Sequence, residues 1–266
     1  MKLFVRPELG LKCDLRQAVL VSGMLLLLVW RTPVQAFQPG IHSEITETAL
    51  KQITVPLATN TSFSQSAITE IVKGNVDVDD PCGFGGEFCL SAAHCDDESI
   101  PACAKRIYEK RDRVLLLLQI PKRDAKEARK VLGQALHTIQ DFYSHSNWVN
   151  NPGLNNTRIN SQLGRDSTLG GIGLERATCR DASVLIDDGL IELTTGYWNH
   201  WPNPQAKCSH GPPFFSDSGI HKDKPSRRFH KEAKKLAVDA TIDYVRLIIQ
   251  QLGTDTQAIA TLLGAQ

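Results

Sequence analysis

The longest helical pattern in the chain covers residues 123–149, "RDAKEARKVLGQALHTIQDFYSHSNWV". Its apolar positions recur at helical spacing, and they are Leu132, Ala135, Leu136 and Ile139. Pro152 follows shortly afterwards and stops the helix, because proline lacks an amide hydrogen and clashes with the preceding turn. An amphipathic helix is stabilised mainly by packing, so the rest of the chain must supply elements that cover its apolar side.

Helical periodicity also dominates the remainder of the sequence. We expect further helices over residues 40–53, 62–76, 102–120 and 226–252, and a weaker one over 181–198. Alternating apolar and polar residues, the pattern of a half-buried strand, are nearly absent. The 266 residues suffice for one domain with a large core, so the sequence predicts a single all-α domain with long loops.

The first 36 residues have the three-part layout of a secretory signal peptide. A basic leader precedes the apolar run "AVLVSGMLLLLVW", and Val34 and Ala36 are small residues at the two positions that a signal peptidase reads. This run of 13 residues is short for a membrane span, which needs about 20. We expect cleavage after Ala36, a mature domain over 37–266 and a secreted or cell-surface protein; an uncleaved signal anchor is the alternative.

Six cysteines remain after this leader, and an even number behind an export signal favours disulfides. They are Cys82, Cys89, Cys95, Cys103, Cys179 and Cys208. The first four lie within 22 residues, which predicts a loop closed by disulfides. A cysteine zinc site is the alternative, although the segment contains no CxxC pair. The sequence does not choose among the possible pairings.

His137, Asp141 and His145 follow one another at intervals of four within the longest helical pattern. Each helical residue turns by about 100°, so these three side chains lie within about 80° of one face. Imidazole nitrogens and carboxylate oxygens are ligands that zinc accepts, and a zinc ion can acidify water for hydrolysis. The alternative is that each histidine is an ordinary hydrogen-bonded residue at the edge of the core.

Cleavage after Ala36 would create a new amino terminus close to a further histidine. The mature chain would start "FQPGIHSEIT", with His42 five positions after Phe37. An α-amine has a pKa of about 8, so its neutral form is accessible to a metal ion. Phe37 and His42 are therefore candidate metal ligands.

This arrangement resembles the zinc-dependent phospholipases C and the fungal single-strand nucleases, an all-α superfamily with a trinuclear zinc cluster. Mature chains of that superfamily start with an aromatic residue whose amine and carbonyl bind zinc, with a histidine shortly afterwards. A carboxylate, a second histidine about 15 residues later and an H-x-x-x-D motif follow. The matching residues in this sequence are Phe37, His42, Asp79, His94, His137 and Asp141.

A closer resemblance is to the Het-C group, a distant branch of that superfamily. The group includes the fungal heterokaryon incompatibility protein Het-C and the N-terminal region of the animal von Willebrand factor A domain-containing protein seven. The resemblance covers about residues 37–250, in the blocks "NVDVDDP", "AHCDDE", "ALHTIQDFYSHSNWV", "TCRDA" and "KCSHG…GIHKDKPS…FHKEA". It implies a helical domain of the zinc-dependent phospholipase C type that binds two or three zinc ions.

The resemblance also implies a role for each ligand. The first zinc ion would be held by Asp79, His94, His137 and Asp141. Asp141 would bridge to a second zinc ion, which Phe37 and His42 would complete. Asp79 and Asp141 would be the catalytic carboxylates of this pair, and a third zinc ion would use His145 and His230.

The third zinc site departs from the superfamily pattern. His145 follows the H-x-x-x-D motif after three intervening residues, where those enzymes usually have five. His230 has Lys234 four positions later, where an acid is expected, so His210 and Asp223 stay open as alternative ligands.

Four other polar residues have less support from the superfamily pattern as metal ligands. Asp77 and Asp80 neighbour Asp79 and are alternatives to it. His200 and His221 match no ligand of the superfamily pattern.

The resemblance predicts an exported phospholipase C-like hydrolase that cleaves phosphodiesters. Phospholipid is favoured over nucleic acid as the substrate, with peripheral membrane contact, because the net charge of +1 provides no basic track. One alternative is a non-catalytic recognition or incompatibility module on the same scaffold, which the missing acid after His230 favours. Another is an exported toxin that attacks membranes.

Overall fold

The structure is a computed structural model that describes residues 37, 39–119, 123–154, 156–170, 176–180, 192–198, 204–211 and 218–265. The expected signal peptide and residues 181–191 of the expected weak helix lie outside the described residues. The rest of that weak helix, residues 192–198, is not helical, so the prediction is wrong there. Among the helices that the structure describes, none combines the length and the apolar character needed to cross a bilayer.

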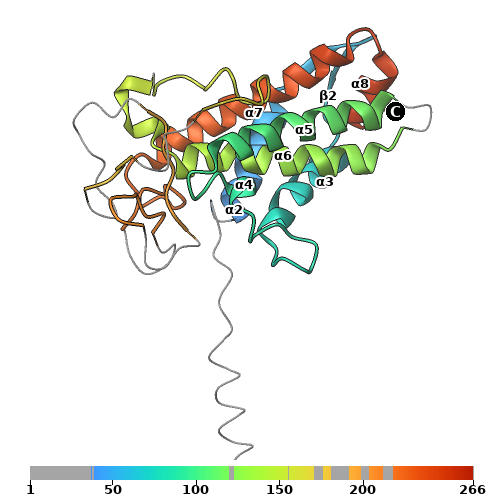
Figure 1. The fold of residues 1–266 in the computed structure, drawn as a ribbon. Coiled ribbons are helices and arrows are strands. Elements are labelled where there is room, and N and C mark those ends of the chain that lie inside the picture. Colours follow the sequence, from blue (N-terminus) through green and yellow to red (C-terminus); the bar gives the residue numbers. More distant parts are fainter. Residues whose placement is uncertain are drawn as a thin grey trace, which may run out of the picture. The chain divides into compact units, whose positions relative to one another are not determined.

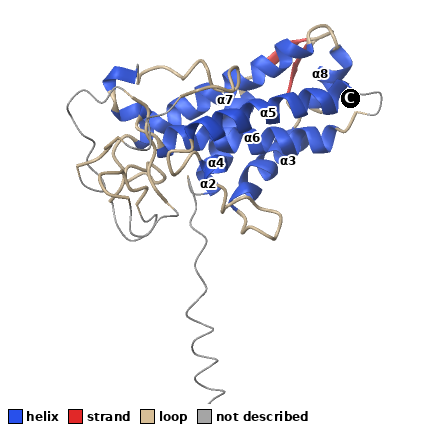
Figure 2. Cartoon of the chain, viewed as in Figure 1, coloured by secondary structure: helices blue, strands red, loops and turns tan. Residues whose placement is uncertain are grey.

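Helices dominate the described part of the chain, which confirms the predicted all-α class (Figures 1 and 2). They are α2 (Pro39–Lys51), α3 (Gln65–Val76), α4 (Ser91–His94), α5 (Ile100–Gln119), α6 (Ala125–His145), α7 (His230–Leu252) and α8 (Thr256–Leu263). The short 3₁₀ helices are η2 (Asp77–Asp79), η3 (Trp148–Asn150) and η4 (Pro152–Leu154). Strands β1 (Thr54–Pro56) and β2 (Asn60–Ser62) form an antiparallel hairpin in which Val55 pairs with Thr61.

Helix α6 is the most enclosed element, and it packs against α3, α5 and α7 (Figure 1). Every residue from Val131 to His145 except Gln134 is buried. The apolar side that the sequence predicts therefore covers only part of the buried surface of this helix. The polar side chains of α6 lie in the interior as well, and each of them needs a partner there.

Two glycines allow α3 and α6 to cross closely. A Cβ atom on Gly133 would lie 2.2 Å from the carbonyl oxygen of Ile71, and one on Gly74 would lie 2.5 Å from the carbonyl oxygen of Lys130. Both distances are shorter than a van der Waals contact, so a larger residue would push the helices apart. This crossing holds the end of α3, and η2 directly after it, against the middle of α6.

Three disulfides fasten the loops, which confirms the predicted oxidised cysteines. The pairs are Cys82–Cys89, Cys95–Cys103 and Cys179–Cys208. The first two lie in the segment between η2 and α5, where the sequence predicts a disulfide-closed loop. The Cys95–Cys103 bond joins the residue after α4 to the first turn of α5, so it fixes the backbone next to His94.

Candidate metal centre

Helices α2, α4 and α6, together with η2, bring five of the predicted ligands into one buried group. We call this group the Asp141 cluster, and it consists of His42, Asp79, His94, His137 and Asp141. Oδ2 of Asp141 lies 2.9 Å from both Nδ1 of His94 and Nε2 of His137. Its other oxygen, Oδ1, lies 3.2 Å from Nε2 of His42. The two oxygens of one carboxylate therefore face different sets of histidines.

Asp79 completes the group on the side of His94 and His137. Its Oδ1 atom lies 3.6 Å from Nε2 of His137 and 3.9 Å from Nδ1 of His94. The neighbouring acids lie elsewhere: Asp77 pairs with Lys73 at 2.6 Å, and Asp80 is exposed. Of the three acids in "NVDVDDP", only Asp79 therefore points into the Asp141 cluster, and it does so from η2, directly after α3.

Two buried amides orient the histidines. Nδ1 of His42 lies 2.6 Å from Oε1 of Gln140, and Nδ1 of His137 lies 3.2 Å from Oδ1 of Asn75. Each amide oxygen accepts a hydrogen bond from Nδ1–H, which leaves Nε2 of the same ring unprotonated and free to bind a metal. Neither amide was expected from the sequence, although Gln140 directly precedes Asp141 and Asn75 occurs near the end of a predicted helix.

Several donor atoms of the Asp141 cluster are buried without a hydrogen-bond partner among the described residues. They are Nε2 of His42, both carboxylate oxygens of Asp79, Nε2 of His94 and Oδ1 of Asp141. Buried polar atoms nearly always have partners, and two buried carboxylates repel each other unless a positive charge lies between them. Nitrogen and oxygen donors that converge without hydrogen-bonding geometry fit divalent cations such as zinc.

The carboxylates and imidazoles of the cluster shift one another's pKa values. Burial lowers the pKa of His42 and of His94, but Asp141 outweighs this effect and raises both. Burial lowers the pKa of His137 to about 3, so its imidazole is neutral at physiological pH. Burial alone would raise the pKa of Asp141, but the neighbouring imidazoles of His137, His145 and His42 hold it well below its usual range. Burial raises the pKa of Asp79 to about 6. Neutral imidazoles and an ionised bridging carboxylate are the forms that bind metal.

Phe37 and His230 contact this region without joining the convergent donors. The Phe37 ring is fully buried, with its centroid 5.6 Å from that of His42 and 5.8 Å from that of His230. Nδ1–H of His230 donates to the carbonyl oxygen of Lys222 at 2.7 Å. Within the described ranges, the groups of three or more ligand atoms that lie within 4.8 Å of one another do not include His230, so its expected role beside His145 stays a prediction.

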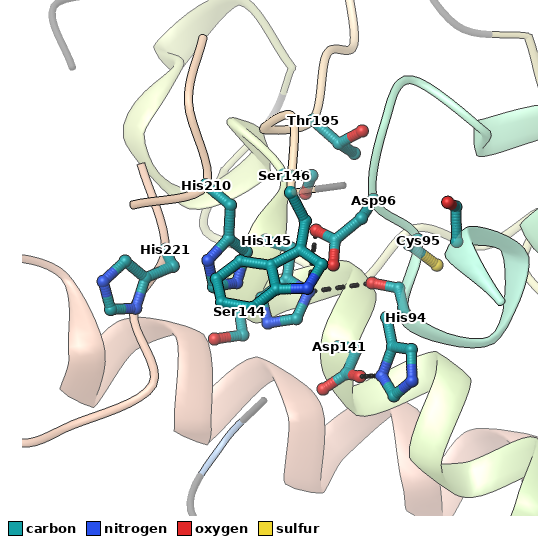
Figure 3. A network of polar contacts seen from close by, with 12 residues as sticks. His94, Cys95, Asp96, Asp141, Ser144, His145, Ser146, Thr195, His210 and His221 are labelled. Carbon is teal, nitrogen blue, oxygen red and sulfur yellow. Dashed lines mark hydrogen bonds and ion pairs between the residues drawn. The ribbon is translucent and has the colours of Figure 1, made fainter. Parts of the chain in front are cut away.

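His145 instead lies among other histidines and acids. Asp96 and Asp223 each lie 3.1 Å from one of its ring nitrogens, and all of these residues are buried. The ring of His210 lies 4.5 Å from that of His145, and His221 stacks on the other side of His210 (Figure 3). His210 and Asp223 are the alternatives that the sequence leaves open, whereas Asp96 and His221 were not expected there. Asp96 and His221 belong to loops, and hydrophobic periodicity does not predict the conformation of a loop. His200 lies outside the described residues.

Comparison with known proteins places this chain in a family. It matches the family model of the VWA7 N-terminal domain over residues 45–258. Von Willebrand factor A domain-containing protein 7 of Rattus norvegicus is 37% identical over 146 residues, which are 48% of this chain and 16% of that protein. The Homo sapiens protein of the same name is 38% identical over 145 residues, which are 47% of this chain and 16% of that protein.

The matched region thus spans about a sixth of the length of these relatives, 16% in each case. No solved structure matches the chain significantly. The family model covers well over half of the chain, including all of the Asp141 cluster except His42. The protein therefore belongs to the VWA7 N-terminal domain family.

Proposed function

We propose that the protein is an exported phosphodiester hydrolase of the phospholipase C type that works with two zinc ions in the Asp141 cluster. The observation that carries this proposal is the position of the Asp141 carboxylate, whose two oxygens face His42 on one side and His94 with His137 on the other. A carboxylate in that position can be shared by two cations, as in two-metal hydrolytic sites.

Each ion would have its own ligand set. One would be held by Asp79, His94, His137 and Asp141. The other would be held by Asp141, His42 and the amine of Phe37, which becomes available once the leader is removed. When bound, such a pair acidifies water and stabilises the charge that develops on a phosphoryl group.

The protein's own residues support this chemistry in two ways. The amide oxygens of Gln140 and Asn75 fix the rings of His42 and His137, so the donor atoms are positioned before any ligand arrives. The surrounding core excludes water, which strengthens electrostatic interactions with the reacting group. Asp141 is ionised in this environment because three histidines favour its charged form.

The exposed edge of the cluster favours a lipid substrate. Asp79 and His94 each keep 5% of their surface exposed, whereas His42, His137 and Asp141 are fully buried, so a substrate would approach from the side of Asp79 and His94. The disulfide-closed loop of residues 82–89 lies at this edge, because the Phe88 ring is 6.0 Å from that of His94. Phe84 of the same loop is 86% exposed, which suits an apolar interface better than a polyanion.

The disulfides support export. Three of them form from the six cysteines after residue 36. Disulfides persist in oxidising compartments and are rare in the reducing cytosol.

The test uses protein secreted by its own leader, with its amino terminus sequenced. We expect it to start at Phe37, to contain zinc and to hydrolyse phosphatidylcholine vesicles, with activity lost on chelation and restored by zinc. His94→Ala should abolish hydrolysis while the circular dichroism of the helices stays unchanged. Zinc-loaded protein that leaves both phospholipid and oligonucleotide substrates intact would overturn the enzymatic proposal.

A second candidate is a non-catalytic recognition module in which the ions only stabilise the fold. The near-complete burial of the donors favours it, as does Lys234, which pairs with Glu44 at 2.6 Å instead of supplying a ligand. The same experiment separates the two candidates, because this module would keep its zinc without turning over any substrate.

A further inference from the structure

The loop of residues 82–89 has an exposed aromatic side chain at its tip. Phe84 is 86% exposed, and it is the only apolar side chain between Cys82 and Glu87. Leu90, which follows the loop, is 47% exposed. Single exposed apolar residues are common on protein surfaces, so exposure alone indicates no partner. The backbone around Phe84 distinguishes it from such residues.

Three glycines surround Phe84 and leave its ring without side-chain neighbours on the loop. Gly83 and Gly85 have φ angles of 91° and 97°, a backbone conformation that residues with a side chain rarely adopt. A Cβ atom on Gly86 would lie 1.9 Å from the carbonyl oxygen of Asp80, so the loop turns too tightly for a side chain there. The sequence "GFGG" therefore places one aromatic ring on a turn that requires glycine on both sides.

Covalent and ionic contacts fasten this loop to α5. The Cys82–Cys89 disulfide closes the loop. The Glu87 carboxylate accepts a hydrogen bond from Nη1 of Arg106 and lies 3.5 Å from Nζ of Lys110, and both cations belong to α5. The loop therefore has a defined position on this helix, and the exposure of Phe84 is a property of the folded loop.

The same two cations line a cavity between α4 and α5. Its volume is about 360 Å³, and its lining residues are Ala92, Ala102, Lys105, Arg106, Glu109 and Lys110. Nη2 of Arg106 is buried and has no hydrogen-bond partner among the described residues, whereas Nε of the same guanidinium donates to the Thr138 hydroxyl at 3.0 Å. A guanidinium group with a free N–H binds an anionic oxygen such as that of a phosphate group.

The charges around the cavity leave one positive charge without a matching acid. Three cations line the cavity, and the acids that pair with them are Glu87 and Glu109. A phosphodiester group carries one negative charge, so it would balance this set of side chains.

An apolar tip beside a cavity for a phosphate group fits a phospholipid bilayer. Acyl chains lie directly beneath the phosphate layer of a bilayer, so an aromatic ring can insert while basic side chains stay at the level of the headgroups. A folded protein partner would instead cover about 800 Å² of this chain. The exposed large apolar side chains of residues 82–94 are Phe84 and Leu90 alone, which are few anchors for such an interface.

From these contacts we infer that the loop of residues 82–89 docks the protein on a phospholipid bilayer. Phe84 inserts among the acyl chains, and Arg106 and Lys110 bind a lipid phosphate group in the cavity. The sequence predicts peripheral membrane contact without naming the surface that makes it, and this loop supplies that surface.

Docking by this loop would place the proposed hydrolytic site at the membrane surface. The Phe88 ring of the loop lies 6.0 Å from that of His94, at the edge of the Asp141 cluster that keeps some exposure. Only this consequence rests on the proposed function, because the docking contacts contain no member of the cluster.

Co-sedimentation of the secreted, zinc-loaded protein with phosphatidylcholine vesicles tests the role of Phe84. Phe84→Ser should lower the affinity for vesicles by about 10–100-fold, because the burial of one phenyl ring is lost. Phe84→Trp should keep the affinity and shift the indole emission to shorter wavelength when vesicles are added. Leu116→Ser is the matched control and should bind like the wild type, because Leu116 is 50% exposed and lies about 15 Å along α5 from Arg106. Equal vesicle affinities of Phe84→Ser and the wild type would overturn the inference.

Lys110→Gln tests the phosphate contact, and Lys126→Gln, which changes an exposed cation of α6, is its control. Lys110→Gln should bind vesicles about fivefold more weakly than the wild type, because one cation near the lipid surface is lost. The control should keep the wild-type affinity, and an equal loss in both variants would contradict the phosphate contact. Inorganic phosphate is the probe for a soluble ligand. Protein that binds inorganic phosphate and no vesicles would assign the cavity to a soluble anion and overturn docking.

Asp141→Asn separates docking from hydrolysis. It should lack phosphodiester hydrolysis and still bind vesicles like the wild type, because Asp141 makes none of the docking contacts. Vesicle binding that depends on Phe84, in wild-type protein that hydrolyses no lipid, would contradict the proposed function and support docking. Lipid hydrolysis by the wild type, with no effect of Phe84→Ser on vesicle binding, would do the reverse.

Discussion

Oδ1 of Asp141 lies 3.2 Å from Nε2 of His42, although the two residues belong to different helices and neither atom has a hydrogen-bond partner in the described structure. The other oxygen of the same carboxylate contacts His94 and His137. A carboxylate held between two sets of imidazoles is the feature from which the proposed two-ion site follows.

Asp141→Asn should remove both ions of the Asp141 cluster at once. An amide presents a single oxygen and no negative charge, so it cannot serve two cations. Elemental analysis should show two zinc ions fewer per chain and no phosphodiester hydrolysis. Asp239→Asn, which changes a half-exposed acid paired with Lys235, is the matched control and should keep the metal content of the wild type. Loss of only one ion in Asp141→Asn would exclude bridging.

Gly133→Ala should destabilise the protein by about 1–3 kcal/mol, because its Cβ would lie 2.2 Å from the Ile71 carbonyl and force α3 away from α6. The same shift should draw Asn75 away from His137 and weaken zinc binding. Gly40→Ala, where no atom lies within 4 Å of the added Cβ, should be neutral or stabilising by about 0.5–1 kcal/mol. Urea unfolding of both variants measures these changes, and equal stabilities would contradict the close crossing.

Asp79→Asn should stabilise metal-free protein at pH 7 while it reduces zinc binding. Burial raises the pKa of Asp79 to about 6, so the folded metal-free protein binds a proton there at a higher pH than the unfolded chain does. Wild-type stability from this group is therefore present below pH 4 and is lost as the pH rises through about 6.

The stability difference between Asp79→Asn and wild type isolates this group from His137. Burial lowers the pKa of His137 to about 3, so His137 has the opposite effect on the protein's stability. Its contribution is present above the ordinary pKa of histidine and is lost as the pH falls below that pKa. Urea midpoints of both metal-free proteins at pH 5 and pH 7 provide the comparison. A stability difference that is the same at both pH values would mean that Asp79 is not desolvated.

The Cys95–Cys103 disulfide should matter more for the metal than the Cys82–Cys89 disulfide. The two close loops of similar length, with sequence separations of 8 and 7, so removing either by paired serine substitutions should cost about 2–3 kcal/mol of stability. Cys95 directly follows His94, however, so only its loss frees the backbone of a ligand. Zinc titration of the two variants should show weaker binding in the Cys95 pair alone, and equal affinities would contradict this role.

Much of the helical framework could be predicted from the sequence. The periodicity of residues 123–149 indicates α6, and the four-residue spacing of His137, Asp141 and His145 correctly predicts that these side chains share a face. The depth at which α6 lies was not predictable, because the approach of α3 depends on Gly74 and Gly133 meeting the backbone of a partner helix. Periodicity describes one helix and contains no information about which neighbour covers it.

The loop donors illustrate the limit of pattern reading. Asp96 reaches His145, and His221 reaches Asp223, through loops that tertiary contacts fix. Among these contacts are the hydrogen bonds from the Asp97 amide to the Gly196 carbonyl and from the Ile220 amide to the Ser209 carbonyl. The spacing of residues along the chain does not predict such tertiary contacts. The weak helical pattern over 181–198 failed at its end for a related reason, because Thr195 pairs with Ser146 in an isolated bridge.

Anomalous diffraction at the zinc edge, from crystals of protein that starts at Phe37, tests the central claim most directly. The account predicts two peaks on either side of the Asp141 carboxylate, about 3.5–4 Å apart, as in other two-metal sites. A single peak, or none within bonding distance of Asp141, would contradict it.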